Sequence, residues 1–447
     1  MTSSADNNNT DEDADKRWEN DPAGTIARLS GVEVSSFSTL TKLDLPNCGL
    51  SSLPTTFPDI VPNLSILFMP KNNFRELPPL IGSCSKLQMV SFKDNGMESI
   101  HPDSLKPQLR WLILTGNSIS QLPDTIGRCK KLQKLMLSGN RLTELPSSME
   151  GCENLELVRL ACNQLKEAPM TLLKLPNLRW VAVSNNPFLT GISDRHDAQL
   201  KVIEDDELDR NDWPVLGQGA GGVTRRVEWK QPDNTMNIVA IKTYSGELTS
   251  DGSPQDERKI SMVASSSGHS CLIQLRGQTK TGALVMEYLD GYTALAGPPS
   301  FETCSRDVYG ADTGNSITGD HAKTIAKGLL EVLIQLHEKG ICHGDFYAHN
   351  ILIRPEGQDR PFQVKLSDFG AAFFYDKIAP YGELIESIEL RAFGVLLEEL
   401  GGLIDKDDSG SASLLKSMAS DCYSTLQSFQ ALYVKYGQEL NKVCGLT

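Results

Sequence analysis

Residues 343–350 read His-Gly-Asp-Phe-Tyr-Ala-His-Asn, and residues 367–370 read Ser-Asp-Phe-Gly. These two stretches supply two carboxylates and one side-chain amide, on Asp345, Asp368 and Asn350. One carboxylate can accept or orient the proton of an attacking hydroxyl, while an amide oxygen and a second carboxylate can hold the magnesium ions that screen nucleotide phosphates. The spacing therefore predicts a phosphotransfer site in the C-terminal half of the chain.

Length and charge limit the other possibilities. The chain has 447 residues, and a guide of about 150 residues per domain predicts two or three domains. The formal net charge is −14, which argues against nucleic acid or an anionic membrane as a partner, because those surfaces need clustered Lys and Arg. The N-terminal residues lack the pattern of a signal peptide, and nowhere do about 20 apolar residues run uninterrupted. We expect a cytoplasmic protein without an integral membrane segment.

Residues 40–188 repeat one template, LxxLxLxxNxL, at intervals of 22 to 24 residues. The ninth position is Asn in six of the seven repeats, so a ladder of side-chain amides can bond the backbone after each short strand. This period and this template indicate an α/β leucine-rich repeat solenoid. The ten cysteines form no paired CxxC motif, so we expect reduced thiols. Those just before repeat leucines, Cys84, Cys129 and Cys152, are predicted to be buried.

Strand side chains that alternate with the buried leucines should line the concave face of the solenoid. Several of them are apolar, and exposed apolar patches tend to be interaction sites. The patch could bind a protein substrate or regulator, or it could be covered by another part of this chain. Its predicted members are Ile66, Phe68, Met89, Trp111, Ile113, Met136 and Trp180.

Four segments follow from the pattern. Residues 1–30 show no repeating apolar pattern and are predicted to be a disordered acidic tail. Residues 31–190 form the repeat domain, and residues 191–210 form an acidic linker, either a solvated connector or a capping helix. The remaining domain covers residues 211–447.

A glycine-rich loop, GQGAGG, contains Gly217, Gly219 and Gly222. The GxGxxG spacing also occurs in dinucleotide-binding units, where it opens a helix. Here a strand follows instead, and the next strand ends in Val-Ala-Ile-Lys at Lys242. A glycine loop between two strands can fold over phosphates, and Lys242 can reach the α- and β-phosphates. We therefore predict a nucleotide-binding loop.

The carboxylate that fixes Lys242 is Asp256 or Glu257, and we favour Glu257 because its longer side chain suits a reach across a cleft. Residues 282–291 read as a strand and connector in which backbone groups of Glu287 and Leu289 could bond an adenine edge. Residues 292–318 form a long insert that is functional or disordered.

Together these motifs resemble the protein kinase superfamily over residues 211–447. The whole chain resembles intracellular leucine-rich repeat protein kinase-like proteins with an HGD-type catalytic loop. The resemblance implies an α+β two-lobed domain that uses ATP and Mg²⁺. It also implies Lys242 on the α- and β-phosphates, Asp345 as the catalytic base, and Asn350 and Asp368 as metal ligands.

The chain departs from the kinase pattern at Gly344 and Tyr347, where most protein kinases carry Arg and Lys. Only 21 positions separate Asp368 from Glu389, which matches the Asp that opens the large helix of the second lobe. This is too short for a regular activation segment, so activation-loop phosphorylation should not be needed.

We therefore predict an ATP- and magnesium-dependent Ser/Thr protein kinase whose repeats recruit a substrate or regulator. The alternatives are a nucleotide-binding pseudokinase scaffold and a small-molecule phosphotransferase. The sequence alone does not identify the substrate.

Overall fold

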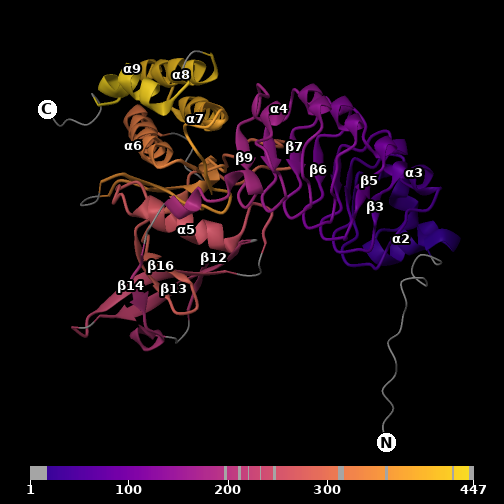
Figure 1. Ribbon diagram of the computed structural model, residues 1–447, viewed down its shortest axis with the longest axis horizontal. Coiled ribbons are helices and arrows are strands. Elements are labelled where there is room, and N and C mark those ends of the chain that lie inside the picture. The colour runs from indigo at the N-terminus through magenta and orange to yellow at the C-terminus, as the bar shows by residue number, and fades with distance from the viewer. Residues whose placement is uncertain are drawn as a thin grey trace, which may run out of the picture. The chain divides into compact units, whose positions relative to one another are not determined.

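The computed structural model (Figure 1) describes residues 18–195, 199–209, 213–219, 221–231, 233–244, 248–310, 317–357, 361–424 and 427–441. The chain forms two compact units, Met1–Asn177 and Leu178–Thr447. The division falls inside the seventh repeat rather than at residue 190, so the strand of that repeat belongs to the second unit.

The first unit is a leucine-rich repeat solenoid, as predicted. Its short strands pair in parallel in the order β1, β2, β4, β6, β7, β8. They are β1 Lys42–Asp44, β2 Ile66–Phe68, β4 Met89–Ser91, β6 Trp111–Ile113, β7 Lys134–Met136 and β8 Leu157–Arg159. Ile66 pairs with Met89 and Met89 with Trp111, which confirms the predicted register of the strand positions. A second pair of strands, β3 Glu76–Leu77 and β5 Ser99–Ile100, and the short helix α3 Phe57–Ile60 lie between them in the chain. The short helix α4 Met170–Leu173 follows β8.

The asparagine ladder connects neighbouring repeats. The Asn95 side-chain oxygen accepts a hydrogen bond from the Phe74 backbone N–H at 3.2 Å, and its Nδ2 donates to the Met69 carbonyl at 2.9 Å. Beside the ladder, Cys129 and Cys152 are fully buried, and burial raises the pKa of these thiols to about 12 and about 11. They pack as small apolar residues, as predicted.

The predicted apolar patch is less exposed than expected. Met89 and Trp111 are buried, and the Lys134 ammonium lies 4.6 Å from the centre of the Trp111 ring. Ile66, Phe68, Ile113 and Met136 are half-buried. The prediction of an exposed patch is therefore wrong for Met89 and Trp111, and in the case of Trp111 the Lys134 side chain helps to cover the ring.

The predicted disordered tail is wrong for residues 22–30, which form α2 Pro22–Ser30. Asp21 caps this helix by accepting a hydrogen bond from the Gly24 N–H at 3.0 Å, and Gly31 ends it with φ of 72°. An N-cap Asp, a Pro at the first helical position and a Gly after the end are helix signals that the missing repeat pattern obscured. Residues 1–17 lie outside the described part of the chain.

The second unit begins with a mixed sheet in the order β10, β15, β16, β14, β13, β11, with β12 paired to β13. The strands are β10 Val202–Ile203, β11 Leu208–Asp209, β12 Val215–Gly219, β13 Gly222–Lys230, β14 Met236–Tyr244, β15 Leu275–Thr279 and β16 Leu284–Glu287. Val227, Val239, Ile241 and Val285 form its apolar core, and helix α5 Pro254–Ser265 follows β14 in the chain.

The acidic linker contributes to this sheet. β10 pairs in parallel with β15, and β11 pairs antiparallel with β13. Ile203 and Leu208 are buried in the sheet core. Residues 202–209 are therefore neither a solvated connector nor a capping helix, because two apolar side chains among the acidic ones complete the edge strands.

A helical lobe follows, in which α6 to α9 gather apart from the sheet formed by β13, β14 and β16 (Figure 1). The helices are α6 Gly319–Glu338, α7 Gly382–Leu403, α8 Ser409–Ser424 and α9 Phe429–Asn441. Two small sheets connect them, one of β17 Thr293–Ala294, β19 Ile351–Arg354 and β20 Gln363–Leu366, the other of β18 Ile341–Cys342 and β21 Phe373–Phe374. Among the described residues, no helix is both long and apolar enough to span a membrane.

Candidate functional site

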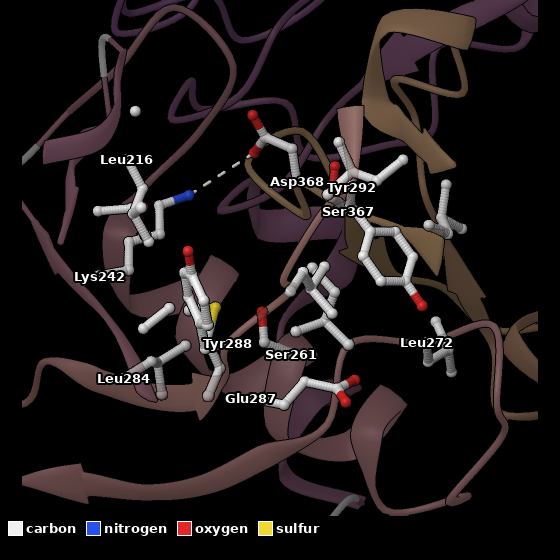
Figure 2. Close-up of a pocket in the computed structure, with 18 of the residues that line it drawn as sticks. Leu216, Lys242, Ser261, Leu272, Leu284, Glu287, Tyr288, Tyr292, Ser367 and Asp368 are labelled. Carbon is white, nitrogen blue, oxygen red and sulfur yellow. Dashed lines mark ion pairs between the residues drawn. The ribbon is translucent and has the colours of Figure 1, made fainter. Parts of the chain in front are cut away.

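A cavity of about 580 Å³ opens in the second unit, lined by β12, β14, β16, α5 and the end of β20. Its apolar walls include Leu216, Leu284, Met286 and Leu366, and its polar groups include Lys242. Figure 2 shows the Lys242 ammonium facing the Asp368 carboxylate, with Leu216, Leu284 and Tyr288 around them. A largely apolar cavity with a few converging polar groups is typical of a small-molecule site.

Lys242 is held between two carboxylates. It lies on β14 between partners on both neighbouring strands, and its ammonium forms an ion pair with the Glu257 carboxylate. Its Nζ also lies 3.7 Å from Asp368 Oδ1. Burial lowers the pKa of Lys242, but the two carboxylates outweigh burial and raise it. The lysine is therefore charged and fixed at the cavity wall.

The structure agrees with the choice of Glu257 over Asp256. Glu257 lies in the first turn of α5 with its side chain 6% exposed. Burial raises the pKa of Glu257, and Lys242 opposes that rise. Asp256 instead accepts a hydrogen bond from the Ser253 hydroxyl at 2.8 Å. The longer side chain is the one that reaches Lys242.

Asp368 sits in an unusual backbone conformation, with φ of 57°. Its Oδ1 accepts the Gly370 N–H at 3.1 Å. Desolvation raises the pKa of the Asp368 carboxyl, but Lys242 and the Gly370 N–H outweigh desolvation and lower it. Left-handed conformations cost free energy in non-glycine residues and tend to cluster at active sites, although repeat turns of this chain contain them too. Asp368 is therefore an ionised carboxylate, and the backbone turn that positions it is strained.

Asp345 and Asn350 contact each other in the loop before β19. Asn350 Nδ2 donates to both the Asp345 carbonyl and Asp345 Oδ2, each at 2.9 Å. Because the amide nitrogen is committed to Asp345, the amide oxygen is the Asn350 atom that could ligate a cation. Neither residue lines the cavity itself.

The donor set fits Mg²⁺ better than a metal enclosed by protein. Magnesium is usually held by one or two protein oxygens, water and substrate phosphates. In the part of the chain that the structure describes, no group of three or more His, Cys, Asp or Glu side chains could hold a metal alone.

Glu389 of α7 anchors the loop that carries Asp345 through hydrogen bonds to the loop backbone. This buried carboxylate accepts from the backbone N–H groups of His343 and Gly344, at 3.1 and 2.7 Å, and lies 2.8 Å from His337 Nε2. His343 is also buried, with its Nε2 3.0 Å from the Ser367 carbonyl. His343 therefore braces the loop against the strand end that carries Asp368.

The three predicted loop glycines have different positions. Gly217 lines the cavity, whereas Gly219 and Gly222 are not among the lining residues. Gly222 opens β13 with φ of 153°, and a Cβ there would lie 2.1 Å from the Thr243 carbonyl oxygen. Close backbone approach within the sheet thus requires Gly222. The loop joins two strands, as predicted.

Glu287 and Leu289 both line the cavity, as predicted. The Glu287 N–H donates to the Gln274 carbonyl at 2.9 Å, so it is used within the sheet. The Glu287 carboxylate pairs with Lys365 and accepts the Gln274 N–H at 2.9 Å. Glu287 thus fixes the position of the connector, a side-chain contact that the sequence did not predict.

Comparison with known families agrees with this geometry. A model of the protein kinase domain matches residues 211–396, and a leucine-rich repeat model matches three overlapping stretches within residues 85–188. The chain joins leucine-rich repeats to a protein kinase domain. The kinase match ends inside α7, so α8 and α9 lie beyond it.

Curated relatives of the kinase domain are protein kinases. A putative cyclin-dependent kinase F-2 of Oryza sativa is 28% identical over 204 residues, covering 42% of this chain and 56% of that protein. The mitogen-activated protein kinase kinase mkk1 of Cytospora mali is 30% identical over 192 residues, covering 39% of this chain and 32% of that protein. The dual specificity tyrosine-phosphorylation-regulated kinase 3 of Rattus norvegicus is 26% identical over 259 residues, covering 52% and 41%. The chain thus spans about a third to just over half of each relative.

The kinase domain uses part of its insert to hold the catalytic loop. Asp307 Oδ1 lies 2.7 Å from His349 Nδ1, and Asp307 Oδ2 accepts the His349 N–H at 3.0 Å. Desolvation lowers the pKa of His349, but Asp307, with Asp345 and Asp368, outweighs it and raises the pKa. Residues 311–316 of the insert lie outside the described residues. No motif in the sequence linked Asp307 to His349.

Trp180 is the predicted patch residue that the structure places in the kinase unit. It is 1% exposed and its ring stacks on that of Tyr347. Trp180 is therefore unavailable to an external partner, and the alternative that this chain covers the position holds for it. The only sequence signal related to this contact was the unusual tyrosine at position 347, on which Trp180 stacks.

Proposed function

We propose that this protein is an ATP- and magnesium-dependent protein kinase that transfers the γ-phosphate to Ser or Thr hydroxyls. The observation that carries the proposal is the fixed position of Lys242. Glu257 pairs with it on one side, and Asp368 lies 3.7 Å from it on the other, at the wall of a cavity of about 580 Å³. The Lys–Glu ion pair supports the proposal, because an active kinase needs such a pair in place.

The side chains around the cavity and in the catalytic loop have distinct roles in the proposed reaction. Lys242 would bind the α- and β-phosphates, and Asn350 and Asp368 would hold Mg²⁺ through their side-chain oxygens. Bound magnesium would neutralise charge that develops on the phosphates. Asp345 would accept the proton of the attacking hydroxyl, and the Asn350 amide, 2.9 Å from its Oδ2, would keep that carboxylate in position.

Lys242 would carry more of the charge compensation than in most kinases. Among the described residues that line the cavity, it is the one basic side chain. Tyr347, which stands where most kinases have a γ-phosphate Lys, is 5% exposed and stacked on Trp180. We therefore expect slower transfer than in kinases that have both lysines.

The test is single-turnover transfer from labelled ATP and Mg²⁺ to a mixed Ser/Thr peptide library, with Asp345→Asn as the control. Loss of a positioned base costs about 10²–10⁴-fold, so we expect a decrease of that size in the variant. If wild type and variant were equally inert while ATP and Mg²⁺ still raised Tm, the chain would be a nucleotide-binding pseudokinase scaffold. Nucleotide at 100 times Kd should stabilise by about 2.7 kcal/mol, and Asp368→Ala should abolish the magnesium-dependent part.

The repeats would recruit a protein substrate or regulator through the half-buried side chains Ile66, Phe68, Ile113 and Met136. Changing Ile113 and Met136 to Arg should abolish phosphorylation of a recruited protein while leaving transfer to a short peptide within about twofold. Retention of the protein substrate by this variant would refute recruitment by this face. Transfer to a small-molecule hydroxyl but to no peptide would instead favour a small-molecule phosphotransferase.

A further inference from the structure

The segment of the seventh repeat that belongs to the second unit, residues 178–194, contacts several elements of the catalytic apparatus. We call it the last-repeat segment. It contains β9 Trp180–Ala182, the short 3-10 helix Pro187–Leu189 and the first two residues of the 3-10 helix Ser193–Arg195. The segment and the residues that it contacts all belong to the second unit.

Trp180 makes two contacts with the catalytic loop. Its ring stacks on that of Tyr347, with centroids 4.2 Å apart and an interplanar angle of 8°. Its indole N–H donates a hydrogen bond of 3.0 Å to the Phe346 carbonyl. The residues contacted follow Asp345 directly in the chain, so the indole fixes the backbone that carries the proposed base.

The next residue of β9 explains the glycine at position 344. Gly344 has φ of 71°, and a Cβ on it would lie 2.5 Å from the Val181 carbonyl oxygen and 2.7 Å from that of Ala371. Real Cβ atoms essentially never approach this closely. An arginine therefore cannot occupy position 344 while the Val181 carbonyl of β9 and the Ala371 carbonyl stay in place. The two departures from the kinase pattern, Gly344 and Tyr347, are both contact points for β9.

Three further contacts involve elements around the active site. The Leu178 carbonyl accepts a hydrogen bond of 2.9 Å from Arg391 Nε on α7. The Phe188 ring meets the ring of Tyr381, just before α7, edge-on at 5.7 Å. Asp194 lies 3.6 Å from Lys259 on α5, the helix that carries Glu257. This last pair is exposed and worth little energy, but it extends the contacts to a third element.

We propose that the last-repeat segment is a built-in positioning element of the kinase, in which Trp180 holds the catalytic loop in its productive conformation. It would take the place of the arginine clamp of kinases that are switched on by activation-loop phosphorylation. The proposal rests on the proposed phosphotransfer function. Trp180 touches no reacting atom, so it is a positioning residue rather than a catalytic one.

The test compares Trp180→Leu with Trp180→Phe in the full-length protein. Phe92→Leu is the matched control, because it also removes a fully buried aromatic ring but lies in the first unit. We expect Trp180→Leu to lower kcat at least tenfold while the Kd for ATP with Mg²⁺ changes less than twofold. Trp180→Phe keeps a ring on Tyr347, so it should recover much of that loss. Phe92→Leu should leave kcat unchanged.

A second measurement does not depend on activity. In Trp180→Leu, backbone amides of residues 343–351 should exchange with deuterium at least tenfold faster, whereas Phe92→Leu should leave them unchanged. Should Trp180→Leu unfold the protein, Phe188→Leu removes only a half-buried edge contact and should still lower kcat several-fold.

The outcomes separate the two proposals. Wild-type kcat and unchanged exchange in Trp180→Leu would overturn the positioning role. If the wild-type protein bound nucleotide but transferred no phosphate, the proposed function would fail, and the exchange rates alone would decide whether Trp180 holds the loop. Equal losses of kcat in Trp180→Leu and Phe92→Leu would show a general effect on folding and would also overturn the proposal.

Discussion

Among single residues, Glu257 fixes the position of Lys242 at the wall of the cavity. Its buried carboxylate pairs with Lys242, which also faces Asp368. Without Glu257, the lysine would be drawn toward Asp368, the proposed metal ligand. We expect Glu257→Gln to lower single-turnover transfer at least tenfold, equivalent to about 1.4 kcal/mol in the barrier.

Asp256→Asn is the control for that substitution, because the neighbouring carboxylate bonds Ser253 instead of Lys242. Its rate should stay within about twofold of wild type. If the two variants lost activity equally, Glu257 would have no special role and the effect would come from destabilising α5.

The Glu399 carboxyl provides a pH-dependent test of the fold. It accepts a hydrogen bond of 2.9 Å from the Tyr309 hydroxyl in the insert, and burial raises the pKa of Glu399 from 4.5 to about 7. Between these values the folded protein binds a proton that the unfolded chain releases. The stabilising contribution is therefore complete below pH 4.5 and is lost as the pH rises through 7.

We accordingly expect Glu399→Gln to raise the free energy of unfolding by about 3 kcal/mol at pH 8 and to have little effect near pH 4.5. Urea unfolding at both pH values measures this difference. Glu383→Gln, an exposed change on the same helix, should stay within about 0.5 kcal/mol of wild type at both. A gain at pH 8 that persisted unchanged at pH 4.5 would contradict the assigned pKa.

At the scale of elements, the backbone of the catalytic loop is held in position by hydrogen bonds to α7. The fully buried Glu389 accepts from two backbone N–H groups and contacts His337. Burial raises the pKa of Glu389, but His337 and His343, with the Gly344 N–H, outweigh burial and lower it, so the residue is an anion. The Gln side chain in Glu389→Gln has one acceptor oxygen instead of two, so at least one of these N–H donors loses its good acceptor. We expect a loss of about 1–3 kcal/mol in urea unfolding with an unchanged m-value.

Elements also differ in how well the sequence predicted them. The repeats were predicted because a period of 22 to 24 residues is a local signal, and the strand pairings confirm it. The catalytic loop and Lys242 were predicted because each lies in a motif of fixed spacing, whereas Glu257 was preferred to Asp256 because its side chain is longer. The edge strands β10 and β11 were missed because a single buried side chain, Ile203 or Leu208, marks each of them among acidic neighbours.

Contacts between distant parts of the sequence were the least predictable. Asp307 and His349 are 42 residues apart, and Trp180 and Phe346 are 166 apart. No periodicity or spacing links such pairs, because tertiary packing alone brings them together. The sequence showed only that positions 344 and 347 were unusual.

At the scale of the whole molecule, the two units should unfold as two transitions in calorimetry, because each has its own core. ATP with Mg²⁺ at 100 times Kd should stabilise only the second unit, by about 2.7 kcal/mol. Phe92→Leu should lower only the transition of the first. A single transition that both perturbations move by the same amount would show that the units are one cooperative structure.

The close approach of β9 to Gly344 also restricts how this protein could be re-engineered. An arginine at position 344 would have to displace the carbonyl groups of Val181 and Ala371, which lie 2.5 and 2.7 Å from where its Cβ would be. A designer who wanted to make the enzyme respond to a phosphorylated loop would therefore have to rebuild the end of the repeat array first.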